Sequence, residues 1–155
     1  MMDATEFMTE LADRLSNDKD IVAWCVEKFG RGPTIFLGID ENAPPEQDDY
    51  PSIAISGVSR AMTQNHYQKS WDIGIGIGIY EETISSSEIA HGSATVILKK
   101  FDGFLLAEAF IDLIEKCIIR KFKVTFQGEH STVSYYPLFV SYTTATIEQI
   151  VNMRR

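Results

Sequence analysis

Residues 71–80 constrain the fold of this chain more than any other part of its sequence. Isoleucine occupies every second position there, and glycine fills most of the positions between. Because successive side chains of a strand point to opposite faces, the isoleucines share one face and the glycines share the other. The segment therefore predicts a strand whose isoleucine face is buried. On the glycine face the bare backbone permits close approach, by a neighbouring helix or by another subunit. The isoleucines are Ile73, Ile75, Ile77 and Ile79, and the glycines are Gly74, Gly76 and Gly78.

Three other segments carry apolar residues at helical spacing and predict helices. Residues 3–16 begin with Asp3 and Glu6 at the spacing of a capping box. A second, shorter helix follows the polar run at residues 17–20, and Gly30 suits its end. The longest helix is expected at residues 102–121, with basic residues near its C-terminus, where they interact favourably with the helix dipole.

Short apolar runs bounded by turn residues predict further strands. The polar residues 59–68 are expected to form a hairpin connection. Residues 83–93 predict an irregular segment, and a short strand at residues 94–98 is a further candidate. The remaining expected strands are residues 34–39, 52–58, 123–127 and 134–147.

These elements predict an α+β fold. The chain has 155 residues, of which 45% are hydrophobic, and this length suits one domain with an ordinary core. We expect residues 1–155 to form a single domain, with one mostly antiparallel sheet packed against the N-terminal helices and one long central helix. Its parts are a helical N-terminal segment at 1–30, the first strands at 33–82, the long helix at 102–121 and the C-terminal strands at 123–147.

Composition excludes several classes of function. A net charge of −8 repels phosphate backbones, so we expect no sequence-specific nucleic-acid binding. Cys25 and Cys117 each lie in an apolar run, which predicts buried thiols and neither a disulfide framework nor a zinc site. No apolar run approaches the ~20 residues that a membrane helix needs, and no basic, apolar leader precedes the first helix. The expected location is the cytoplasm.

The sequence offers no clear catalytic, cofactor or metal site, and we expect none. The glycines of residues 74–78 lack the spacing and the following helix of a dinucleotide loop. Glu88 and His91 have the spacing of half a di-iron site, but such a site needs a second pair, so a solvent-facing pair is the simpler interpretation. The alternative is a small cytoplasmic enzyme or ligand-binding domain with scattered site residues such as His66, His91 and Glu88.

The loop at residues 40–50 is the first candidate for an interaction surface. It contains five acids, no base and two prolines, and it is either a solvated loop or a contact for a basic partner surface. A basic cluster near the end of the long helix could supply that surface on a neighbouring subunit. The acids are Asp40, Glu41, Glu46, Asp48 and Asp49, and the bases are Lys116, Arg120, Lys121 and Lys123. Five aromatic residues in the expected strands are either core residues or interface anchors: Trp71, Tyr135, Tyr136, Phe139 and Tyr142.

The order of the elements indicates a family. Paired N-terminal helices precede a short strand, and a Pro-rich acidic loop then runs into Tyr50-Pro51-Ser52-Ile53-Ala54-Ile55. The strand at 71–82, the helix at 102–121 and a Tyr/Thr-rich strand at 138–147 complete the series. This layout resembles that of the tail terminator, or tail completion, proteins of long-tailed bacteriophages and prophages. The resemblance lies in element order, so it carries over no individual functional residue.

The resemblance implies a structural protein. Members of the family form rings, often hexameric, that cap the tail tube and offer a docking face to the head. It therefore implies self-association, contact with a tail tube protein and a head–tail connector protein, and no enzymatic activity. The implied location is the bacterial cytoplasm and, when the phage is active, the virion. An acidic lumen would let DNA pass without gripping it, although solubility alone also accounts for the negative charge.

Overall fold

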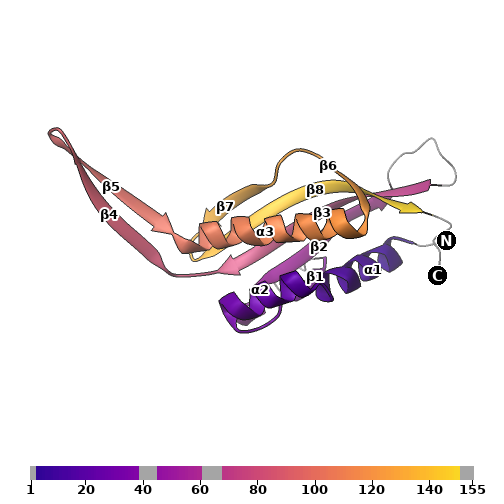
Figure 1. Ribbon diagram of the computed structural model, residues 1–155. Coiled ribbons are helices and arrows are strands. Elements are labelled where there is room, and N and C mark those ends of the chain that lie inside the picture. Colours follow the sequence, from indigo (N-terminus) through magenta and orange to yellow (C-terminus); the bar gives the residue numbers. More distant parts are fainter. Residues whose placement is uncertain (1–2, 39–44, 61–67, 151–155) are drawn as a thin grey trace.

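Two helices, a run of strands, a long helix and a second run of strands follow one another in an α+β arrangement (Figure 1). The structure is a computed structural model that describes residues 3–38, 45–60 and 68–150. Within those ranges, no helix combines the length and the apolar character that crossing a membrane requires. The helices are α1 (Ala4–Ser16), α2 (Lys19–Phe29) and α3 (Asp102–Lys121). The strands are β1 (Thr34–Leu37), β2 (Ser52–Arg60), β3 (Gln68–Tyr80), β4 (Ile84–His91), β5 (Ala94–Phe101), β6 (Lys123–Phe126), β7 (Ser131–Tyr135) and β8 (Leu138–Ile150).

The predicted helices are confirmed together with two of their end signals. The Asp3 carboxylate accepts a hydrogen bond from the Glu6 N–H at 2.8 Å, and the Glu6 carboxylate accepts one from the Asp3 N–H at 3.3 Å. This reciprocal pair is the capping box expected at the start of α1. Gly30 ends α2 in the left-handed conformation, with φ of 78°, which glycine adopts without steric cost.

The main sheet has six strands and is mostly antiparallel, as predicted. Its order is β1-β2-β3-β8-β6, with β7 also paired to β8; only the β1–β2 pair is parallel. Both β6 and β7 lie against β8, because β6 pairs with its last residues and β7 with its first. The prediction of one strand over residues 134–147 was wrong. Tyr135 pairs with Leu138, so a two-residue turn that contains Pro137 separates two antiparallel strands.

The isoleucine face of β3 is buried, as predicted. Ile75 and Ile77 belong to the same core as Phe110 and Ile114 of α3. The helices α1 and α2 contribute to that core too, through stacked ring pairs: Phe7 lies 5.3 Å from Trp71, and Trp24 lies 5.0 Å from Phe110, between ring centroids.

The glycine face of β3 is approached by tyrosines, which corrects the expectation of a helix or another subunit. A Cβ atom added at Gly74 would overlap the hydroxyl of Tyr142, which comes from the adjacent strand β8. A Cβ atom at Gly78 would lie 2.6 Å from a ring carbon of Tyr50. The missing side chains at these two glycines therefore let tyrosines of the same chain approach the sheet closely.

The prediction of an irregular segment at residues 83–93 was also wrong. Strands β4 and β5 form a separate two-stranded hairpin, which extends beyond the end of the main sheet (Figure 1) and which we call the arm. Gly92 and Ser93 make its two-residue turn, with Gly92 at φ of 60°. Glycine suits the first central position of a type II′ turn, and serine can follow it at the second. This Gly-Ser pair is the hairpin signal in the sequence. The candidate strand at 94–98 is confirmed, and it continues to Phe101.

Candidate functional site

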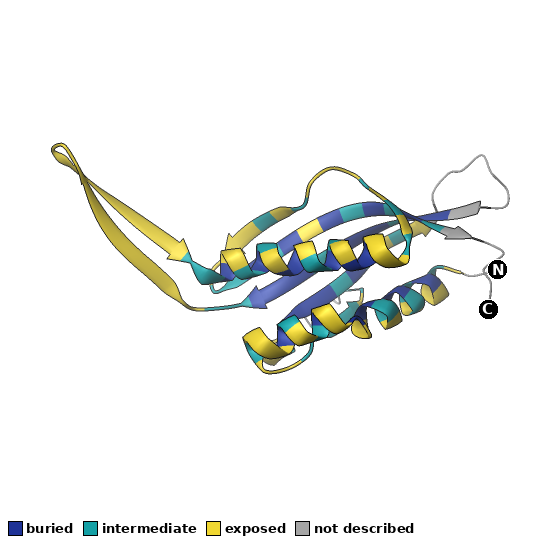
Figure 2. Cartoon of the chain, in the orientation of Figure 1, coloured by how far each residue is buried: buried dark blue, intermediate teal, exposed yellow. Residues whose placement is uncertain are grey.

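The arm places large apolar side chains in solvent. Every residue from Ile84 to Lys100 is exposed (Figure 2). Five large apolar side chains of the arm retain between 40% and 60% of their accessible surface: Ile84, Ile89, Val96, Ile97 and Leu98. Isolated two-stranded hairpins are marginally stable in water, and contiguous exposed apolar residues mark interaction surfaces in folded proteins. The arm is therefore the first candidate site.

The register of the arm divides these side chains between two faces. Directly opposite residues of an antiparallel pair share a face. Ile89 pairs with Val96, and Leu98 and Lys100 lie on that same side at two-residue intervals. We call these four residues the Leu98 face. The opposite side carries Ile84, Glu88, Ile97, Lys99 and Phe101.

The base of the arm is held in place by contacts with the main domain. The Phe101 ring packs against Tyr136 and Phe139, at 5.8 and 6.2 Å between centroids. The Asp102 N–H donates to the carbonyl of Thr83 at 3.2 Å, which ties the end of β5 to the start of β4. These contacts hold the base of the arm, while its large apolar side chains remain exposed.

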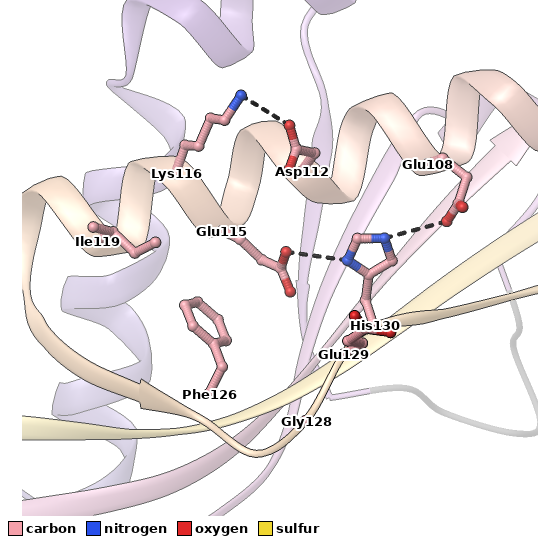
Figure 3. A pocket seen from close by; sticks show the side chains of 9 residues that line it. All are labelled: Glu108, Asp112, Glu115, Lys116, Ile119, Phe126, Gly128, Glu129 and His130. Atoms are coloured by element: carbon pink, nitrogen blue, oxygen red, sulfur yellow. Dashed lines mark hydrogen bonds and ion pairs between the residues drawn. The ribbon is translucent and has the colours of Figure 1, made fainter.

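A pocket of about 530 Å³ between α3 and the connection from β6 to β7 is the second candidate site. His130 stands at its centre, and two carboxylates point at it from α3 (Figure 3). The Nδ1 atom of His130 lies 3.1 Å from Glu115, and the Nε2 atom lies 3.3 Å from Glu108. Both ring nitrogens can donate to these carboxylates only when the imidazole carries two protons. Thr132 donates a hydrogen bond to Glu108 from the adjacent strand.

The pocket is acidic at its rim and apolar at one end. Besides the two carboxylates around His130, the described lining contains Asp112 and Glu129. It contains one lysine, Lys116, which pairs with Asp112 at 2.9 Å. Ile119 and Phe126 form the apolar end. In the described part of the chain, no group of three His, Cys, Asp or Glu side chains is arranged to hold a metal ion.

His130 was not predicted from the sequence to be a site residue. Glu108 and Glu115 are seven residues apart, which is about two helical turns, so both lie on one side of α3. The histidine comes from a turn after the next strand, and the fold alone brings it between them. No sequence spacing links the three residues.

Only part of the acidic loop lies within the described residues, which exclude Asp40 and Glu41. Glu46 and Asp48 are exposed, and the Asp49 carboxylate accepts a hydrogen bond from the Glu46 N–H at 2.8 Å across a short 3-10 helix, Gln47–Asp49. Arg31 donates to the carbonyl of Tyr50 at 2.9 Å and so holds the end of the loop. Contact of this loop with a basic partner surface stays a prediction.

The four basic residues of the predicted interface each have a carboxylate of the same chain nearby. Arg120 lies 2.8 Å from Asp18, and Lys121 lies 4.0 Å from it. The other two pairs are Lys116 with Asp112, at 2.9 Å, and Lys123 with Glu148, at 3.6 Å. The structure does not bring these cations to the described part of the acidic loop, so their role at a subunit contact also stays a prediction.

Asp18 is the buried member of this set. Its carboxylate caps α2 by accepting from the N–H groups of Asp20 and Ile21, at 3.1 and 3.0 Å. Burial raises the pKa of Asp18, but hydrogen bonds from the Ile21 N–H and from Arg120 are among the contacts that outweigh it and hold the pKa below its usual value. The ionised carboxylate therefore stabilises the docking of α2 on the end of α3.

The substitution Asp18→Asn is expected to lower the free energy of unfolding at pH 7 by about 1 kcal/mol, because asparagine keeps the cap but loses the charge. Since the folded-state pKa is depressed, this contribution is present above the unfolded pKa, near 3.8, and is lost as pH falls through the folded value. Denaturant titrations at pH 7, 4 and 3 should show the two proteins converging. Asp20→Asn, at an exposed position beside it, is the control. A constant difference between wild type and Asp18→Asn at all three pH values would contradict the linkage.

Two of the three residues of the alternative scattered site, Glu88 and His91, lie within the described residues. His66 lies outside the described residues, and Glu88 and His91 are exposed on β4. Because they are three positions apart in a strand, they point to opposite faces of the arm, so they do not form half of a di-iron site. Both side chains face solvent, as the simpler interpretation predicted, but they are not paired with each other. Both cysteines are buried, as predicted, and burial raises the pKa of each thiol to about 12.

Two of the five aromatic candidates are core residues, and a role of the other three as interface anchors stays a prediction. Trp71 and Phe139 are buried in the core. Tyr135, Tyr136 and Tyr142 are exposed.

Comparison of the chain with protein-family models and with curated proteins finds no match.

Proposed function

We propose that this chain is a structural subunit that self-associates into a ring, as the tail terminator proteins of bacteriophages and prophages do. The observation that carries the proposal is the arm, which extends from the domain with five large apolar side chains in solvent. Covering a half-exposed side chain of this size contributes about 1 kcal/mol. A neighbouring subunit that covered several of them would therefore bind with useful affinity.

The place of the arm in the fold allows the same contact between copies to repeat around a ring. The arm leaves one end of the main sheet, whereas the helices lie along the sheet itself (Figure 1). The pocket is lined by α3 and the β6–β7 connection. A contact between an arm and the body of another copy joins two different surfaces. Such head-to-tail contacts generate closed rings when the rotation between subunits closes, and filaments when it does not.

The biological role in the proposal comes from the order of elements. It resembles the order in proteins that cap the tail tube and join it to the head–tail connector. The proposed partners are accordingly other copies of this chain, a tail tube protein and a connector protein. The proposed locations are the bacterial cytoplasm during assembly and the virion afterwards.

Shortening the arm is expected to convert the oligomer into a monomer. A variant that lacks residues 85–91 and 94–100 would join Ile84 to Phe101 through the existing Gly92–Ser93 turn, because Ile84 and Phe101 are already paired. Light scattering and negative-stain microscopy should show rings for the wild type and monomers for the variant, while the helical part of the circular dichroism spectrum and a cooperative unfolding transition are retained. A wild type that stays monomeric at every concentration contradicts the ring, and a variant that still forms rings removes the arm from the assembly.

The pocket favours a second candidate function, a ligand-binding or catalytic domain. An imidazole between two carboxylates in a pocket of this size is an arrangement that acid–base sites use. This candidate predicts a monomer whose pocket binds a small cation-bearing ligand, and the light-scattering measurement separates it from the ring.

A further inference from the structure

The arm and the pocket are complementary in charge. Glu88 is the only acid between Ile84 and Phe101, and it lies on the side of the arm opposite the Leu98 face. The Leu98 face carries Lys100, which has no ion pair with another described residue. The pocket has the opposite character, with four carboxylates and one lysine, so the cationic, apolar side of the arm fits it electrostatically.

The two surfaces also match in their apolar parts. Ile119 stands at the end of the pocket with 58% of its surface exposed, beside the partly buried ring of Phe126. On the arm, Ile89, Val96 and Leu98 form a continuous apolar strip next to Lys100. Burying the strip against these two side chains removes apolar surface from water on both partners.

The pocket of a chain cannot receive the arm of the same chain. The arm is eight residue pairs long and points away from the end of the sheet, while the pocket lies beside the middle and C-terminal half of α3 (Figure 1). The base of the arm is held by Phe101 and by the Thr83–Asp102 hydrogen bond, which oppose its folding back. A contact between the arm and the pocket therefore joins two copies of the chain.

We propose that the Leu98 face of one copy's arm docks in the pocket between α3 and the β6–β7 connection of a second copy. The proposal rests on the proposed ring and names the contact that builds it. In this contact Lys100 pairs with Glu129. Glu129 is the available carboxylate, since it is exposed and the other three pocket carboxylates already have ion pairs with described residues. Leu98 and Val96 cover Ile119 and Phe126.

Charge reversal on the two sides tests this contact. Sedimentation velocity is measured on wild type, Lys100→Glu, Glu129→Lys and the double variant. Each single reversal is expected to raise the dissociation constant about tenfold, and the double variant to return close to the wild-type value. Lys99→Glu is the matched control, since it makes the same change one residue away on the other side of the arm, and it should have a much smaller effect.

Apolar substitutions give a second test that does not depend on charge. Leu98→Ser is expected to weaken association, whereas Ile97→Ser, on the opposite side of the arm, should leave it near the wild-type value. All these positions are exposed, so circular dichroism spectra should stay unchanged.

The outcomes separate the docking site from the ring. A wild-type ring that is indifferent to Lys100→Glu and Leu98→Ser, or a double reversal no tighter than the singles, overturns the docking site and leaves the ring standing. Equal effects of Lys100→Glu and Lys99→Glu also overturn it, because they indicate net charge without a specific face. A wild type that remains a monomer overturns both the docking site and the ring, and assigns the arm to a different partner.

Discussion

Replacing Ile77 by alanine is expected to lower the free energy of unfolding by about 2–5 kcal/mol, as buried large-to-small substitutions do. Ile77 is 2% exposed in the middle of β3, between Ile53 of β2 and Ser141 of β8. Alanine would leave a cavity between the sheet and α3, because neighbouring strands on both sides limit how far the site can collapse. Denaturant-induced unfolding, followed by circular dichroism, gives the change.

The matched control is Ile97→Ala on the arm, which removes the same atoms from a side chain that is 60% exposed. Its effect on the unfolding of the monomer should stay within about 0.5 kcal/mol, as is usual for surface positions. Equal costs at the two positions would contradict the burial of the isoleucine face.

Replacing Gly103 by alanine is expected to destabilise the domain by about 2 kcal/mol. A Cβ atom at this position would overlap the ring of Phe139, which is fully buried and packed beside Phe101 and Tyr136. The ring cannot move aside without disturbing those neighbours, and overpacking of this kind costs about 1–3 kcal/mol. The better helix propensity of alanine, up to about 1 kcal/mol, offsets part of the cost.

Two further variants show whether the Phe139 ring is the cause. In a Phe139→Leu background, Gly103→Ala should cost clearly less, which a double-mutant cycle measures directly. Gly76→Ala adds the same methyl group where the nearest atom would be 3.6 Å away, an ordinary contact, and should be tolerated. A Gly103→Ala protein as stable as the wild type would show that the helix can shift at its start.

Local signals predicted the helices and most of the main sheet. Asp3 and Gly30 mark helix ends through hydrogen bonds and backbone conformations that involve only neighbouring residues, so sequence spacing suffices to find them. The alternation in residues 71–80 likewise identified the buried face of β3. The arm was missed because its polar first strand buries nothing, and the Gly92–Ser93 turn was its only clear signal.

The site depended on contacts that the sequence does not encode as spacing. Glu108 and His130 are separated by a helix end, a strand and a turn, and only the pairing of β6 and β7 along the same strand brings them together. For the same reason the sequence did not identify Asp18 as the partner of Arg120, because the two residues are far apart in the chain.

The sequence by itself determined the fold class, the helix ends and the buried face of β3, since each follows from side-chain periodicity or from bonds within a few residues. Tertiary structure decided what fills the glycine face, where the arm points and which carboxylates surround His130. Tyr142 lies over Gly74 because β8 pairs with β3 in one register, and a shift of one residue would turn that ring into the core. Register and strand order arise from packing of the whole chain, which no local pattern contains.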